Sequence, residues 1–160
     1  MKVSAQEEYG LRCLVQLATL GEGDFLTLGQ LAGREGISQA NAGKVLWILN
    51  KAGLVTSNRG TKGGYRLARP AEEIRLSEVI KVLDGDELAS HCKSFAGVLD
   101  SCVHTSDCGI RPVLASLHDA VRQALSGITL AQLVGDESKV ETTLYQIHAS
   151  APPAGQRNAG

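Results

Sequence analysis

The 160-residue sequence predicts a mainly α-helical fold with a small β-wing, in which a winged helix-turn-helix domain precedes a long dimerisation helix. Three observations predict this fold. Two short helical patterns are joined by a tight turn that contains Gly36. A glycine-rich loop, residues 58–64, lies between two strand-like segments, as in a hairpin. Residues 109–127 then carry apolar side chains at helical spacing. From this spacing alone, the helix could pack within its own chain or pair with the same helix of a second copy.

The N-terminal helices follow from apolar spacing and from residues that cap helices. The first helix is expected over residues 3–20, where Ser4 and a glutamate three residues later have the spacing of a capping box. Thr27 is expected to begin the second helix, and Gly36 to end it. Ser38 is a good cap for the third helix. The sequence therefore predicts three helices before the hairpin.

The later elements are predicted in the same way. The two strands of the hairpin are expected at residues 54–57 and 65–68. A short helix is expected from Ser77, as its cap, to Asp84. After the long helix, Thr129 is expected to cap a last short helical turn.

Charge is distributed unevenly along a chain whose net charge is −1. Residues 28–69 carry seven Lys and Arg and one acidic residue, a net charge of +6. The first 27 residues carry −2, and residues 70–160 carry −5. A basic module in an acidic chain can be a solvated surface or a face for a polyanion. Because a basic hairpin directly follows a helix with a polar tip, the pattern favours double-stranded DNA.

These patterns divide the chain into three parts. Residues 1–70 are predicted to be the winged helix-turn-helix DNA-binding domain, and residues 71–134 a cysteine-containing loop with the dimerisation helix. Residues 135–160 are predicted to be a disordered tail. Within it, Val140 and Leu144 are spaced as in a weak helix.

The third helix is expected to enter the major groove by its N-terminal turn. Gln39 and Asn41 can each present a donor and an acceptor to the edge of adenine. Lys44 is expected at a phosphate, and the hairpin tip at the minor groove or the adjacent phosphates. The candidate DNA-binding residues are Ser38, Gln39, Ala40, Asn41, Lys44, Arg59, Thr61 and Lys62.

A second candidate site is the segment that holds Cys92, Cys102 and Cys108. It has neither helical nor strand periodicity, and a loop that gathers thiols is more often a metal site than a core element. Thiolates select zinc, cuprous copper or iron–sulfur clusters. Three ligands are one fewer than the usual four. The remaining cysteine, Cys13, is expected to be a buried apolar residue of the first helix.

Six motifs occur in order over residues 1–134. They are residues 1–4 (MKVS), 35–38 (EGIS), 51–55 (KAGLV), 59–67 (RGTKGGYRL), 74–80 (IRLSEVI) and 128–134 (ITLAQLV). Together they resemble the Rrf2 family of winged-helix regulators, which includes IscR, NsrR and RirA. The resemblance implies homodimeric transcription factors that bind palindromic DNA. It also implies an iron–sulfur cluster held by three cysteines before the dimerisation helix, at positions that match Cys92, Cys102 and Cys108.

The resemblance also bears on the fourth ligand. IscR uses a histidine three residues after the last cysteine, and Arg111 stands there in this chain. The first gap in the cysteine loop is also longer than in IscR. NsrR-like members use an acidic residue in the first helix of the other subunit, a position that matches Glu8. We therefore expect Glu8 of the partner subunit as the fourth ligand, and a 4Fe–4S cluster in preference to a 2Fe–2S cluster.

Other roles remain open for these residues. Glu8 could be a surface carboxylate paired with Arg12 four residues later. His91 and His104 are competing ligands, and His118 is expected at an interface rather than on a metal. A carboxylate is a hard ligand in soft iron–sulfur chemistry, so the iron that it binds would be weakly held. Oxygen, nitric oxide or iron limitation could then act at that coordination position.

Two further functions compete with an iron–sulfur sensor. The first is a DNA-binding regulator whose cysteines form a thiol switch or bind structural zinc. The second is an enzyme that uses Cys102 and His104, but the sequence has no phosphate loop, nucleophile elbow or zinc-helix motif. We therefore expect a protein that is not an enzyme. No apolar run approaches about 18 residues, and the N-terminus has no hydrophobic signal core, so we expect a cytoplasmic protein.

Overall fold

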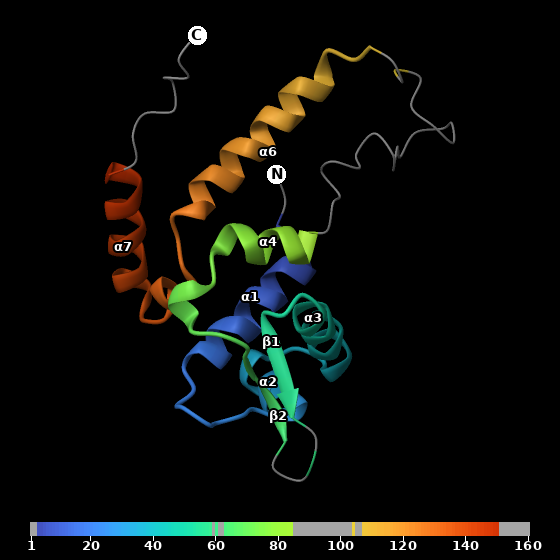
Figure 1. The fold of residues 1–160 in the computed structure, drawn as a ribbon, viewed down its shortest axis with the longest axis vertical. Helices are drawn as coiled ribbons and strands as arrows, with labels where there is room; N and C mark the ends of the chain where they lie inside the picture. The colour runs from blue at the N-terminus through green and yellow to red at the C-terminus, as the bar shows by residue number, and fades with distance from the viewer. Residues whose placement is uncertain (1–2, 59, 61–62, 85–103, 105–106, 151–160) are drawn as a thin grey trace.

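The computed structural model describes residues 3–58, 60, 63–84, 104 and 107–150. The elements of the N-terminal body are α1 (Ala5–Ala18), α2 (Leu28–Glu35), α3 (Gln39–Lys51), β1 (Val55–Asn58) and β2 (Gly64–Leu67). The elements that follow are η1 (Ala71–Glu73), α4 (Leu76–Asp84), α6 (Ile110–Ser126), η2 (Leu130–Leu133) and α7 (Glu137–Ser150). In Figure 1 the β-hairpin lies at the bottom, α4 crosses the middle, α6 rises above α4, and α7 stands at the left. The mainly helical fold with a small antiparallel sheet confirms the predicted fold class.

The predicted caps of the three N-terminal helices are present. The Glu7 backbone N–H donates to Ser4 Oγ at 3.2 Å, and the Glu7 carboxylate accepts from the Ser4 backbone N–H at 2.6 Å. Thr27 begins α2 with a second capping box. Gly36 ends that helix at φ 65°, in the left-handed region that favours glycine. The helix-turn-helix is therefore specified by local signals.

The wing is an antiparallel pair in which Val55 lies opposite Leu67. Leu26 adds an isolated bridge to Tyr65, with N–H···O distances of 3.1 and 2.8 Å. This bridge ties the wing to the segment before α2. A Cβ added at Gly64 would lie 2.5 Å from the Leu26 carbonyl oxygen, so glycine is required for this close approach.

One core unites the body with the segment after α6. Its largest fully buried side chains include Leu14 on α1, Leu46 on α3, Leu83 on α4 and Leu130 on η2. Because η2 contributes to this core, the chain that leaves α6 returns to the DNA-binding body. The placement of α6 is thereby fixed at its C-terminal end.

The predicted start of α4 is corrected by one such long-range contact. Arg75 pairs with Thr129 in a β-bridge, and the Leu76 backbone N–H donates to the Ile128 carbonyl at 2.9 Å. The bridge holds Arg75 extended, and its carbonyl accepts the first helical hydrogen bonds. Ser77 therefore lies inside the first turn of α4 and does not cap it.

The C-terminal segment is more ordered than predicted. Thr129 lies at the expected N-cap of η2, where its backbone N–H and its hydroxyl donate to Gln132 Oε1 at 2.8 and 3.3 Å. The predicted disorder is wrong over α7, because the weak helix suggested by Val140 and Leu144 is present there. The Asp136 carboxylate accepts from the Lys139 backbone N–H at 2.9 Å and begins this helix. Residues 151–160 lie outside the described residues.

No helix in the described part of the chain is long and apolar enough to cross a membrane.

Candidate nucleic-acid interface and cysteine site

The polar side chains predicted to read DNA lie together at the start of α3. Its buried residues, Ala42, Val45, Leu46 and Leu49, turn one side of the helix toward the core. Ser38, Gln39, Ala40, Asn41 and Lys44 are all exposed. The first turn of α3 therefore presents two carboxamides and a hydroxyl to solvent.

Ser38 caps α3, and its hydroxyl can also donate a hydrogen bond. Its Oγ accepts from the Asn41 backbone N–H at 3.2 Å. A hydroxyl that accepts one hydrogen bond still has a hydrogen to donate. Ser38 can thus stabilise the helix and contact a base or phosphate at once.

The tip of the wing is described only in part. The predicted DNA contacts Arg59, Thr61 and Lys62 lie outside the described residues. At the base of the wing, the Arg66 guanidinium lies over the Phe25 ring, 5.0 Å from its centroid. This arginine is therefore held against the body of the domain.

The sequence prediction overlooked two exposed residues of α3. Trp47 is 64% exposed, and Lys51 places its ammonium 5.1 Å from the centroid of the Trp47 ring. Both lie on the side of the helix that carries Lys44. The spacing of the buried residues already implied that the opposite side of α3 is exposed. Residues seven apart, such as Lys44 and Lys51, share that side.

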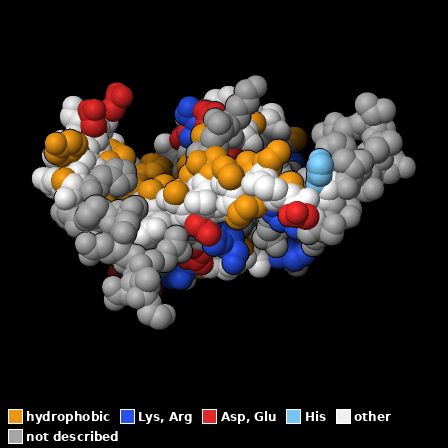
Figure 2. All heavy atoms as spheres, turned by 90° about the horizontal axis from the view of Figure 1, so that it is seen from above, with side chains coloured by type: hydrophobic (Ala, Val, Ile, Leu, Met, Phe, Trp, Pro, Cys, Tyr) orange, Lys and Arg blue, Asp and Glu red, His pale blue; other side chains and the backbone are white. Residues whose placement is uncertain are grey.

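α6 carries an apolar side that the described residues leave uncovered. Ile110 and Val113 are each 65% exposed, and Leu117 is 51% exposed. Figure 2, seen from above, shows hydrophobic side chains in a band across this face of the molecule. None of the α6 residues is buried. The half-buried His118 has a buried Nε2 with no hydrogen-bond partner among the described residues.

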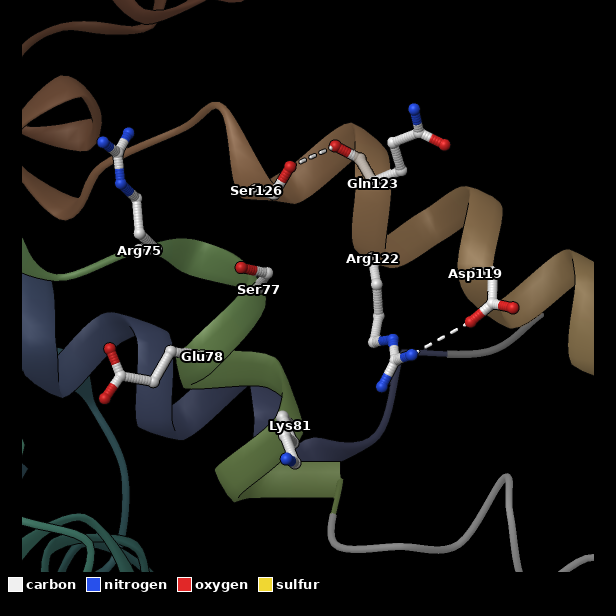
Figure 3. A pocket seen from close by; sticks show the side chains of 8 residues that line it. All are labelled: Arg75, Ser77, Glu78, Lys81, Asp119, Arg122, Gln123 and Ser126. Carbon is white, nitrogen blue, oxygen red and sulfur yellow. Dashed lines mark hydrogen bonds and ion pairs between the residues drawn. The ribbon is translucent and has the colours of Figure 1, made fainter. Parts of the chain in front are cut away.

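A polar groove of about 590 Å³ lies between α4 and α6 (Figure 3). Its lining residues are Arg75, Ser77, Glu78, Lys81, Asp119, Arg122, Gln123 and Ser126. Asp119 pairs with Arg122 at 2.9 Å, and Glu78 pairs with Arg69 outside the groove. Because the lining carries both cations and anions, the groove favours neither anionic nor cationic ligands.

The predicted cysteine ligands are described only at their C-terminal end. Cys92 and Cys102 lie outside the described residues, whereas Cys108 is half-buried two residues before α6. Arg111, the residue at the IscR histidine position, donates from Nη2 to the His104 carbonyl at 3.1 Å. The described residues contain no cluster of three or more His, Cys, Asp or Glu side chains suited to a metal.

Glu8 makes the ion pair that its spacing allowed. Its Oε1 accepts from Arg12 Nη2 at 2.9 Å and from Nε at 3.0 Å. Arg12 Nη1 also lies 3.5 Å from Glu35 Oε2, at the last residue of α2. The hydrogen bond to Glu8 is the main reason why the Arg12 pKa is raised. The Glu8 side chain remains 52% exposed.

Comparison with known proteins identifies the family. A family model, Rrf2, described as an iron-dependent transcriptional regulator, matches residues 3–136. The chain belongs to the Rrf2 family. Rrf2 regulators bind DNA, so this chain is a DNA-binding transcriptional regulator with the winged-helix fold.

Three solved structures show how far this Rrf2 chain resembles known relatives. The oxidised form of CymR from Staphylococcus aureus is 29% identical with a TM-score of 0.64, over 85% of this chain and 98% of that one. CymR of B. subtilis, titled the global cysteine regulator, is 26% identical with a TM-score of 0.63, over 84% and 99%. IscR of T. potens is 26% identical with a TM-score of 0.62, over 96% and 94%.

Proposed function

We propose that this Rrf2 regulator is a homodimer that reads a palindromic operator with α3 and the wing. It senses redox state, nitric oxide or iron supply through an iron–sulfur cluster. The ligands are Cys92, Cys102, Cys108 and Glu8 of the partner subunit, and the cluster is of the 4Fe–4S type. The exposed polar tip of α3 is the observation that carries the DNA-reading part.

Support for direct reading comes from the chemistry of that tip. Gln39 and Asn41 are exposed, uncharged and able to form paired hydrogen bonds with a base edge. Lys44 and the wing cation Lys62 suit phosphates, which position the protein but carry no sequence information.

The test compares Gln39→Ala with Lys62→Ala on an operator-like duplex selected from a random library and on random-sequence DNA. Gln39→Ala should reduce affinity for the selected duplex by about 1–3 kcal/mol and barely affect random DNA. Lys62→Ala should weaken binding to both and lower the salt slope by about 1. Equal losses on both duplexes for Gln39→Ala would refute the base-reading role.

Support for a homodimer comes from α6. Its apolar side, with Ile110, Val113 and Leu117, is uncovered by the described residues. A second copy of the same helix would cover it symmetrically. Two DNA-binding domains related by a twofold axis would match the two halves of a palindromic operator.

Support for an iron–sulfur cluster comes from the donor set. Three thiols suit the soft acceptors of a cluster. The Cys108 thiol is only half-buried, and the Glu8 carboxylate is open to solvent on α1, where another chain can reach it. When bound, such a group supplies redox and nitric-oxide reactivity that the side chains lack. Thiols and a carboxylate of this chain therefore fit the group.

Arg12 competes with any metal for the Glu8 carboxylate. Its two contacts to Glu8 would have to be given up, whereas its contact to Glu35 would remain. Both side chains of the Glu8–Arg12 pair are half exposed, so the pair contributes little to stability. Releasing Glu8 thus costs little.

Anaerobically purified protein should be brown and contain iron and sulfide. Glu8→Ala should then shorten the lifetime of the visible spectrum in air. Arg12→Ala is the matched control, because it breaks the same ion pair but leaves the carboxylate. If Glu8 is a ligand, only Glu8→Ala destabilises the cluster. If the two variants behave alike, Glu8 acts only as a partner of Arg12.

A thiol switch or structural zinc is the alternative, favoured by the 29% identity to a CymR structure in an oxidised form. A colourless anaerobic protein with stoichiometric zinc, or with none but with an oxidant-induced disulfide, would support it. Metal analysis and mass spectrometry of the full chain separate these cases.

A further inference from the structure

We propose that Trp47 is a DNA-contacting residue that packs its indole against the sugar–phosphate backbone, between phosphates held by Lys44 and Lys51. This inference rests on the proposed reading of DNA by α3. It adds a contact farther along the helix than the base-reading turn.

The first argument is position on the helix. The buried side of α3, with Leu46 and Leu49, faces the core. Lys44, Trp47 and Lys51 follow one another at spacings of three and four and share the opposite side. All three are exposed. A helix that enters a groove with its first turn carries this side along the wall of the groove.

The second argument is distance from the reading turn. Trp47 lies eight residues after Gln39, or about 12 Å along the helix axis. The major groove is itself only about 12 Å wide. A side chain so far from the inserted end is therefore expected at the phosphodiester backbone rather than at a base edge.

The third argument is the chemistry of the group. An indole that is 64% exposed leaves a large apolar surface in water. The Lys51 ammonium 5.1 Å from the ring centroid makes a cation–π contact that places a positive charge beside this surface. An apolar plate between two cations complements the deoxyribose and phosphates of one strand.

The first test uses intrinsic fluorescence, because Trp47 is the only tryptophan of the chain. The probes are duplexes selected by the full-length protein from a random library. Two forms of the protein are compared, one purified anaerobically and one treated with a chelator. The form that binds the duplexes more tightly is used. Saturation should change the intensity of the indole emission and shift its maximum to shorter wavelength, because the ring leaves water. An unchanged spectrum at saturation would overturn the proposal.

The second test is Trp47→Ala, with Tyr145→Ala on α7 as the control for an exposed aromatic, since Tyr145 is 77% exposed. Trp47→Ala should weaken binding about fivefold or more, equally on selected and random-sequence duplexes. The salt slope should stay unchanged, because no charge is lost. Lys51→Ala should instead lower that slope by about 1. Trp47→Phe should recover part of the affinity, and Tyr145→Ala should bind like the wild type.

Wild-type affinity for Trp47→Ala, with native helicity by circular dichroism, would overturn the proposal. A loss confined to the selected duplex would also overturn it, because that pattern means base reading. If Trp47→Ala is silent while Gln39→Ala relaxes sequence preference, this inference fails and the proposed function stands. If both variants are silent, α3 does not read DNA and the proposed reading fails with it.

Discussion

Two cysteines of this chain show how strongly position controls the chemistry of one residue type. Cys13 is 0% exposed and packs in the core, and burial raises the pKa of its thiol from 9.0 to about 11. The Glu35 carboxylate adds to this rise. Cys108 is half-buried just before α6. At the residue scale, Cys13 is a packing residue, and Cys108 is available for chemistry.

The first prediction is that Cys13 resists alkylation in the native protein. With a pKa of about 11, its thiolate fraction at pH 8 is about 100-fold lower than at the ordinary value, and burial slows access further. After iodoacetamide treatment of cluster-free protein, peptide mass spectrometry should find label on Cys108 and none on Cys13. In guanidinium chloride Cys13 should react. Equal labelling in the native state would contradict the burial.

The same pKa shift makes the free energy of unfolding depend on pH. Between about pH 9 and 11 the unfolded thiol loses its proton and the buried thiol keeps it. The unfolded state then binds fewer protons, so the contribution of Cys13 to the free energy of unfolding falls as pH rises through this window. Below pH 9 the contribution is fully present. In Cys13→Ala, urea unfolding should show a weaker dependence on pH across this window.

At the scale of elements, α3 has to be stable and, in the proposed function, also has to contact DNA with its exposed side. The core residues fix its rotation, and Ser38 begins it through a hydrogen bond from the Asn41 backbone N–H. The exposed side can therefore be changed without loss of core packing. The cap is the exception, because the same hydroxyl serves the helix and faces the proposed ligand.

Ser38 variants separate these two roles. Ser38→Ala should lower the free energy of unfolding by about 1 kcal/mol, because it removes the cap. Ser38→Asp keeps a capping oxygen and should retain stability, but its negative charge should weaken binding to any duplex. Urea unfolding and DNA titration measure the two effects. Loss of stability in Ser38→Asp equal to that in Ser38→Ala would mean that the cap is not the source.

At the scale of the whole molecule, α6 packs against α4 along one side and leaves its other apolar side uncovered among the described residues, while the segment after it returns to the core. Leu130 is fully buried with the side chains of the body, whereas Leu117 is 51% exposed. An apolar side with this exposure on a regulator of this family is best covered by a second copy. The body thus holds the core of the chain, and α6 is the element through which we propose that two copies assemble.

Leu117→Asp should weaken self-association at least about tenfold, because each subunit loses apolar burial at a symmetric interface. Ala115→Asp is the matched control, since it places the same charge on the exposed side of α6 away from Leu117. Analytical ultracentrifugation measures the assembly, and circular dichroism should show native helicity in both variants. An unchanged dimer in Leu117→Asp, or a monomeric wild type, would contradict this assembly.

The sequence by itself determined the elements that depend on neighbours in the chain. Helix caps at Ser4, Thr27 and Ser38 and the left-handed Gly36 act over three or four residues, so their spacing predicted α1, α2 and α3. The periodicity of apolar residues predicted which side of α3 is exposed, and with it the polar set around Gln39. The cysteine ligands came from thiol chemistry and from family resemblance, and they remain a proposal.

Only the tertiary structure decided what depends on residues far apart in the sequence. The Arg75–Thr129 bridge moved the start of α4 away from the predicted Ser77 cap. The contact of Arg12 with Glu35 joined α1 to the end of α2. Such contacts carry no local sequence signal, because their strength depends on how separate elements pack. Local hydrogen bonds thus determined where α3 begins, and packing determined how the other elements are placed around it.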